Sequence, residues 1–202
     1  MSGRIGKCSR SSHNGKRETI MTVSEIYTTA PSGGLSPEQR QVFDTLAELG
    51  IPFERVEHDW ANTMEDCKAV SAVLGVDVCK NLVLCNRQKT QFYLLCMPGG
   101  KPFHTKDLSR QLGCARLSFA PPEAMEELLR VHPGSASILS LLFDRDRRVQ
   151  LVMDRETKEC DYFSCHPCES TGTLKLRTKD VLEVFLPHTG HQPVTVELPW
   201  EL

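Results

Sequence analysis

Apolar residues recur at helical spacing in several segments of the chain, and most of these segments begin or end at a capping signal. Over residues 36–50, a Ser-Pro-Glu-Gln capping box is followed by apolar residues every three or four positions and then by glycine, which predicts a helix. Further helices are predicted from Thr63 to Leu74, from Thr105 to about Leu112, from Pro121–Pro122 to Leu129, and from Thr178 to about Leu186.

Short runs of almost uniformly apolar residues predict buried strands. Residues 80–85 and 91–97 flank a polar Asn-Arg-Gln-Lys-Thr segment and predict a central β-hairpin. Ile138–Phe143 and Val149–Met153 bracket Asp-Arg-Asp-Arg-Arg and predict a second hairpin. The remaining strands are predicted at Pro52–His58, Tyr162–Cys165, Leu174–Leu176 and Val194–Leu198. This mixture predicts one α+β domain with a central mixed or antiparallel sheet.

The first 34 residues follow neither pattern. They are rich in Ser, Gly, Thr, Lys and Arg with almost no apolar periodicity, so residues 1–34 are expected to be a disordered extension and 35–202 the folded domain. A chain of 202 residues is long enough for one domain with a sizeable core.

Bulk composition restricts the function classes further. The net charge of −2 excludes a polycation, so RNA binding would use a local basic patch. No apolar run approaches the roughly 20 residues of a membrane-spanning helix. Nine scattered cysteines, odd in number and with no secretory segment before them, favour free thiols in a reducing cytoplasm.

The Pro-Gly-Ser loop at residues 133–135 is the first candidate site. Gly134 has no Cβ and lets the backbone approach a ligand closely, while Ser135 keeps the loop small. Such a loop offers free N–H groups to a phosphate, a carbonyl or a developing oxyanion. By residue type alone it is also an ordinary turn.

A lysine lies at the start of an apolar strand in Cys79-Lys80-Asn81. Lysine seldom enters such a position without a partner, although a strand-end lysine can also extend to solvent. Lys80 is suited to hold a phosphate as a point charge, and Asn81 is a candidate to hydrogen-bond a ligand. Lys68, Lys101 and Lys106 are further candidates for backbone contacts or, equally, surface charges.

His166 lies between two thiols in Cys165-His166-Pro167-Cys168. Proline restricts the residue before it to extended or turn geometry, and an imidazole can exchange protons near neutral pH. The Cys-x-x-Cys spacing also admits zinc, a redox pair or a cysteine nucleophile. A structural zinc site needs about four ligands, and the sequence holds no second such pair.

Three separated motifs occur in a fixed order: Cys-Lys-Asn-Leu at residues 79–82, Arg-Leu-Ser-Phe with the Pro-Gly-Ser loop, and His-Pro-x-x-x-Thr-x-Thr at residues 166–173. Together they resemble the YbaK-like trans-editing domains associated with prolyl-tRNA synthetase. Within that group the freestanding alanyl-tRNA(Pro) deacylases are most similar. The resemblance runs from about Ser36 to Leu198 and implies a YbaK-like domain with a barrel-like sheet surrounded by helices.

The resemblance assigns a role to each candidate. It implies that Lys80 contacts the 3′-terminal adenosine of tRNA, that His166 lines the catalytic pocket, and that the loop at Gly134 shapes the amino-acid pocket. The loop carrying His58 and Thr63 would grip the acceptor end. Catalysis would involve no covalent enzyme intermediate and no metal or other cofactor.

The sequence departs from the family pattern at two places. Ser170 stands where the family has asparagine before Thr171, so a hydroxyl replaces a carboxamide. Ile138 stands where a proline would follow the loop at Gly134. Both residues lie in segments that the resemblance assigns to the substrate, so it supports neither a role that needs both a donor and an acceptor at residue 170 nor a particular pocket size. Ser170 and Thr171 remain candidates for binding.

The resemblance implies a cytoplasmic hydrolase that removes alanine from mischarged tRNA(Pro), protecting translation fidelity. Its partners would be the tRNA acceptor end and prolyl-tRNA synthetase, with no DNA or membrane, in a monomer or weak dimer. Three alternatives stay open: a deacylase for cysteine or serine, a non-catalytic module that binds the tRNA end, and a cysteine-based redox or zinc protein.

Overall fold

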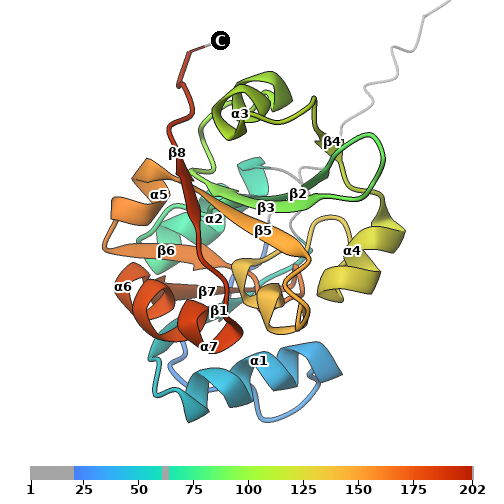
Figure 1. Ribbon diagram of the computed structural model, residues 1–202. Coiled ribbons are helices and arrows are strands. Elements are labelled where there is room, and N and C mark those ends of the chain that lie inside the picture. The colour runs from blue at the N-terminus through green and yellow to red at the C-terminus, as the bar shows by residue number, and fades with distance from the viewer. Residues whose placement is uncertain (1–20, 61–63, 202) are drawn as a thin grey trace, which may run out of the picture.

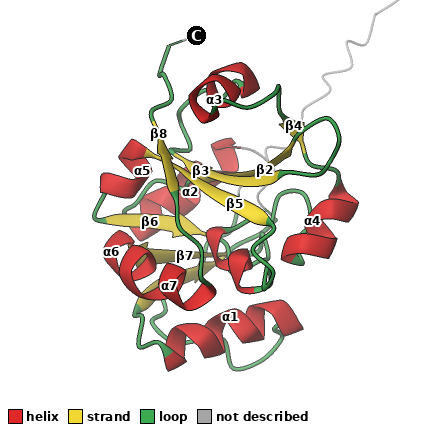
Figure 2. Cartoon of the chain, viewed as in Figure 1, coloured by secondary structure: helices red, strands yellow, loops and turns green. Residues whose placement is uncertain are grey.

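The computed structural model describes residues 21–60 and 64–201, which form two β-sheets with helices around them (Figures 1 and 2). The helices are α1 Pro37–Glu48, α2 Met64–Leu74, α3 Thr105–Leu112, α4 Pro122–Leu129, η1 Ile138–Leu142, α5 Arg155–Glu159, α6 Thr178–Asp180, η2 Val181–Phe185 and α7 Leu186–Thr189. The strands are β1 Phe53–Glu57, β2 Lys80–Cys85, β3 Phe92–Met97, β4 Ser118–Phe119, β5 Val149–Asp154, β6 Tyr162–Cys165, β7 Gly172–Arg177 and β8 Val194–Val196. The predicted α+β class is confirmed.

The larger sheet has the strand order β4-β2-β3-β5-β8. Strands β2 and β3 form the predicted antiparallel hairpin, whereas β3 pairs with β5, and β5 with β8, in parallel. The sheet is therefore mixed, and β3 lies at its centre as the uniformly apolar sequence predicts.

The predicted second hairpin is wrong. Ile138–Leu142 form the 3-10 helix η1, and β5 pairs with β3 and β8 instead. The Ser137 hydroxyl accepts a hydrogen bond from the Leu139 amide, and the Ser140 hydroxyl donates to the Ser137 carbonyl. These local bonds favour a helical turn over a strand. A short buried apolar run carries no periodicity that distinguishes the two.

The smaller sheet has the order β1-β7-β6, with both pairs antiparallel. Outside the named strands, Val23 forms a bridge to His58 and Tyr27 forms a bridge to Arg55. The predicted disorder over residues 1–34 therefore does not extend over residues 21–34, which lie beside β1; residues 1–20 are outside the described part. Two open sheets replace the expected barrel-like sheet.

Helix boundaries largely follow the capping signals. The Ser36 hydroxyl accepts from the Gln39 amide and the Gln39 side chain accepts from the Ser36 amide, which confirms the capping box of α1. Gly75 has φ +64° after α2, as its position predicts. The residues before α3 and α6 are His104 and Arg177, so the predicted threonine caps lie one residue inside those helices.

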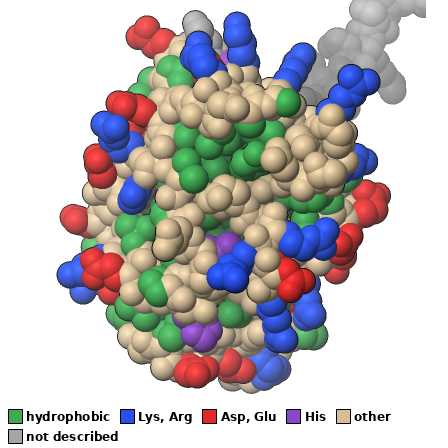
Figure 3. All heavy atoms as spheres, in the orientation of Figure 1, with side chains coloured by type: hydrophobic (Ala, Val, Ile, Leu, Met, Phe, Trp, Pro, Cys, Tyr) green, Lys and Arg blue, Asp and Glu red, His purple; other side chains and the backbone are tan. Residues whose placement is uncertain are grey.

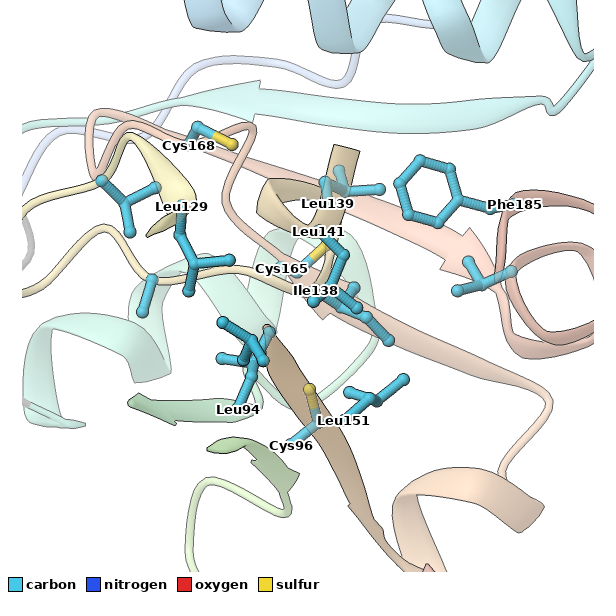
Figure 4. Packing of buried hydrophobic residues seen from close by; sticks show 14 of the residues in the cluster. Leu94, Cys96, Leu129, Ile138, Leu139, Leu141, Leu151, Cys165, Cys168 and Phe185 are labelled. Carbon is cyan, nitrogen blue, oxygen red and sulfur yellow. The ribbon is translucent and has the colours of Figure 1, made fainter. Parts of the chain in front are cut away.

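The main hydrophobic core takes side chains from both sheets. Leu94, Cys96 and Leu151 of the larger sheet point toward η1, and Cys165 of the smaller sheet lies beside Ile138 (Figure 4). A second cluster covers the opposite face of the larger sheet beneath α3. The loops that carry Gly134 and His166 adjoin η1 and β6, whose side chains pack in this main core.

Candidate functional site

The loop between β6 and β7 carries His166. Its Nδ1 lies 2.8 Å from the carbonyl oxygen of Gly172, across the loop. Because a carbonyl only accepts, Nδ1 carries the proton in this contact and Nε2 of the neutral ring has a lone pair. Within the described part of the chain, Nε2 of His166 has no hydrogen-bond partner. The loop also holds Cys168 at φ +64°, a left-handed conformation rare for a residue with a Cβ.

His58, at the end of β1, lies beside His166. The ring centroids are 6.0 Å apart. Nδ1 of His58 lies 2.8 Å from the Asp59 carbonyl oxygen, and Nε2 lies 2.8 Å from Oγ1 of Thr173. The first contact places the proton on Nδ1, so the Thr173 hydroxyl donates to Nε2. Thr173 Oγ1 is also 3.4 Å from Nδ1 of His166 and so connects the two rings.

Both imidazoles are shifted toward their neutral forms. Burial lowers the pKa of His58, although the Asp59 carbonyl and carboxylate oppose it. Burial also lowers the pKa of His166, and the neighbouring His58 lowers it further. At neutral pH the pair therefore offers hydrogen bonds and a lone pair, with no cationic charge.

Ser170 and Thr171 lie in the same loop. The carbonyl of Thr171 accepts from the His58 amide at 3.0 Å, while its side chain is exposed. The Ser170 hydroxyl is fully buried and has no hydrogen-bond partner among the described residues. Such a hydroxyl is uncommon, and it lies at the position where the resemblance led us to expect a carboxamide. Thr63, the remaining candidate of this region, is outside the described residues.

A cavity of about 370 Å³ opens on this side of the smaller sheet. His58, Pro167 and the 171–174 segment line it, together with Leu35, which precedes α1. The cavity could not be predicted from the sequence, because its walls come from segments that are distant in the chain.

The Gly134 loop is a tight turn beside Trp60. Gly134 has φ +92°, and a Cβ built on it would lie 4.0 Å from the Trp60 ring. The Ser135 amide donates to the His132 carbonyl at 3.0 Å, so this N–H is already occupied. The expected pair of free N–H donors is therefore wrong for Ser135, whereas the Gly134 amide has no partner among the described residues. Sequence reasoning did not single out Trp60, because its 46% exposure is visible only in the structure.

Lys80 and Asn81 project to opposite faces of β2, as successive strand residues do. Nζ of Lys80 donates to the backbone carbonyl of Lys101 at 2.7 Å, and burial lowers its pKa. The Asn81 side chain accepts from the Cys96 thiol at 3.0 Å and lies on the face of the main core. Among described residues, no hydrogen bond or ring contact joins Lys80 to His166 or Gly134.

The burial and pKa of the Cys165 and Cys168 thiols do not support a cysteine nucleophile or a redox pair. Cys165 and Cys168 are buried, and burial raises the pKa of Cys165 to about 12 and that of Cys168 well above its usual value. A thiol in this state is a poor nucleophile at neutral pH. Within residues 21–60 and 64–201, no group of three His, Cys, Asp or Glu side chains is placed to hold a metal ion.

Comparison with known proteins decides the family. The model of the aminoacyl-tRNA editing domain matches residues 58–184, which include all three motifs. This chain belongs to the aminoacyl-tRNA editing domain family. The matched segment begins at His58 and also contains His166 and the Gly134 loop.

Several members of the editing family are similar over most of their length. The prolyl-tRNA synthetase associated domain-containing protein 1 of Danio rerio is 33% identical over 88% of this chain and 95% of its own. The prolyl-tRNA editing protein ProX of Acetoanaerobium sticklandii is 27% identical over 79% of this chain and 97% of its own. A solved structure, described as a candidate trans-editing enzyme for prolyl-tRNA synthetase, has a TM-score of 0.60 at 18% identity, over 82% of this chain and 100% of that one. This last likeness concerns the fold.

No helix in the described part of this editing domain is both long and apolar enough to cross a bilayer.

Proposed function

We propose that this editing domain is a trans-acting hydrolase that deacylates mischarged Ala-tRNA(Pro). The observation that carries the proposal is His166, neutral, held at Nδ1 by the Gly172 carbonyl and open at Nε2, inside a motif of the editing family. The name of the bacterial relative, a prolyl-tRNA editing protein, supports prolyl-tRNA as the substrate class.

In the proposed reaction, water attacks the carbonyl carbon of the ester between alanine and the terminal ribose. The bond from that carbon to the ribose oxygen breaks, and a proton passes from the water to the leaving oxygen. Nε2 of His166 accepts a hydrogen bond from the water and orients it. The free Gly134 amide donates to the developing oxyanion. Lys80 holds the terminal adenosine or its phosphate, and the neighbouring ribose hydroxyl assists in placing the water.

Physical limits on amino-acid selection explain the need for such an enzyme. A synthetase pocket built for proline rejects the smaller alanine only by about 10- to 200-fold, because missing methylenes contribute little discrimination. A second and smaller pocket that admits alanine and excludes proline removes the error. The alternative substrate for a deacylase of this family is a tRNA that carries cysteine or serine in place of alanine. The departures at Ser170 and Ile138 lie where that preference would be decided.

A non-catalytic module that binds the tRNA end is the second candidate. Two observations favour it: Ser170 supplies one hydroxyl in place of the donor and acceptor of the expected carboxamide, and one of the three N–H donors of Lys80 is occupied by the Lys101 carbonyl. Each leaves fewer polar groups for chemistry than the family pattern would.

The deciding experiment measures deacylation of Ala-, Cys-, Ser- and Pro-tRNA(Pro) by the purified protein, its Lys80→Ala and His166→Ala variants, and Lys179→Ala as a control. Lys179 is an exposed lysine on α6. Hydrolysis of the alanine ester alone, slowed but still measurable in the first two variants and unaffected in the third, is the expected result. Faster deacylation of Cys- or Ser-tRNA(Pro) would keep the enzymatic function but identify a different substrate. Tight tRNA binding without turnover would establish the binding module.

A further inference from the structure

Lys101, in the loop between β3 and α3, is almost completely buried. Its side chain is 1% exposed, and Nζ lies 3.1 Å from both carboxylate oxygens of Asp154, itself fully buried. Nζ also contacts the Glu156 carboxylate at 2.7 Å. Burial by itself would lower the pKa of Lys101, but the two carboxylates outweigh burial and raise it. The lysine is therefore a fixed internal cation.

The same carboxylates attach the C-terminal segment to this loop. Asp154 accepts from the Leu198 amide at 3.0 Å, and Glu156 accepts from the Trp200 indole at 2.8 Å. The Trp200 ring centroid lies 5.2 Å from Nζ of Lys101, which adds a cation–π contact. Three separate segments of the chain therefore converge on one ammonium group.

The backbone of Lys101 contacts the candidate residue Lys80. Its amide donates to the Pro98 carbonyl at 3.1 Å, which closes a turn, and its carbonyl accepts from Nζ of Lys80 at 2.7 Å. The atom that holds the Lys80 ammonium is thus two bonds from the Cα whose side chain enters the Asp154–Glu156 cluster. A buried ion pair is an inefficient source of stability, because desolvation offsets the attraction. The ion pair of Lys101 with Asp154 and Glu156 instead holds in place the backbone that contacts Lys80.

We propose that Lys101, anchored by Asp154 and Glu156, is a positioning residue that fixes its own carbonyl and thereby the direction of the Lys80 side chain. The inference rests on the proposed function of Lys80 at the tRNA end. When the anchor is loosened, the turn at Pro98–Lys101 moves, and Lys80 loses the acceptor that points it toward the ligand. The substituted residue never touches the tRNA.

The test is a double-mutant cycle on deacylation kinetics and on the affinity for a tRNA(Pro) acceptor minihelix. The single changes are Lys80→Ala, Lys101→Met and the milder Glu156→Gln, each also combined with Lys80→Ala. We expect Lys101→Met to reduce kcat/KM about 10- to 100-fold, with the same division between KM and kcat as Lys80→Ala. In the Lys80→Ala background, neither anchor change should have a further effect.

Two matched controls separate positioning from simple loss of stability. Glu54→Gln breaks the half-exposed Lys175–Glu54 pair, whose 3.0 Å contact resembles that of Lys101 with Glu156. Asp144→Asn weakens a second buried contact in the described part of the chain, in which Asp144 lies 3.1 Å from Nε2 of His191. Both controls should behave as wild type in kinetics and affinity.

Effects of Lys101→Met and Glu156→Gln that add fully to Lys80→Ala would overturn the inference, as would wild-type values for both. If Lys101→Met does not fold, Glu156→Gln decides by the same criteria, since that carboxylate is half exposed and tolerates the change. A wild-type protein that neither binds the minihelix nor deacylates tRNA would instead contradict the proposed function.

Discussion

Oγ1 of Thr173 and Nε2 of His58 lie 2.8 Å apart, and this hydroxyl connects His58 to His166. Thr173 is buried on β7, which pairs with β1 directly before His58. The contact fixes the tautomer of one imidazole and lies beside the other. The orientation of the two histidines therefore depends on Thr173, the last residue of the His-Pro motif at residues 166–173.

Replacing Thr173 with valine tests this relationship. Valine keeps the shape but removes the donor, so the buried Nε2 of His58 is left without a hydrogen bond, at a cost of about 1–3 kcal/mol in the free energy of unfolding. Urea denaturation measures the loss, and ¹⁵N shifts of the imidazoles report the tautomer. Thr173→Ser keeps the hydroxyl and is the control. Equal stability and unchanged shifts in the two variants would contradict the assignment.

Stability should depend on pH through the same histidines. Burial lowers both folded-state pKa values below 6.5, whereas the unfolded chain titrates near 6.5. Between these values the unfolded chain binds more protons, so the stabilisation present above pH 6.5 is lost as the pH falls through the folded pKa values. Urea denaturation between about pH 8 and 5 should show the decline.

The control for the pH dependence is a double variant, His58→Gln with His166→Gln, whose stability should change less over that window. An equally steep decline in this variant would assign the effect to other groups.

Gly134 holds a backbone conformation that alanine adopts only with strain. Its φ of +92° and the free space before Trp60, 4.0 Å from a built Cβ, make backbone strain the main consequence of Gly134→Ala. We expect a loss of about 1–2 kcal/mol in the free energy of unfolding. Deacylation should fall about 10- to 100-fold as the loop shifts.

Gly50→Ala provides the comparison for Gly134→Ala, because Gly50 also has a positive φ, +65°, and no atom within 4 Å of its built Cβ. It should lose stability to a similar extent but keep wild-type deacylation, and an equal loss of deacylation at the two glycines would rule out a special role for the loop.

The thiols of buried Cys165 and partly buried Cys79 should be chemically inert. With a pKa of about 12, Cys79 and Cys165 are almost entirely protonated at pH 8. Alkylation by iodoacetamide, followed by peptide mass spectrometry, should be slower at these residues by on the order of 100-fold or more in native protein than in urea. Rapid native labelling of Cys165, accompanied by loss of deacylation, would return the cysteine nucleophile to consideration.

Local patterns in the sequence were sufficient for most elements. The capping box at Ser36, the glycine at position 75 and the β2–β3 hairpin each depend on residues a few positions apart, where propensity and hydrogen bonding act directly. The run at residues 138–142 shows where this reasoning fails. Its apolar side chains suit a buried strand or a buried helical turn equally. Local hydrogen bonds of the Ser137 and Ser140 hydroxyls stabilise the helical turn.

The candidate site divides in the same way. The sequence by itself determined which residue types are present: a lysine at a strand start, a His-Pro loop and a Pro-Gly-Ser turn. Only the tertiary structure decided that His58 meets His166, that Lys80 and Asn81 face opposite ways, and that Lys101 is buried with Asp154. These contacts join residues far apart in the chain. Strand pairing and core packing select such contacts collectively, so no local pattern encodes them.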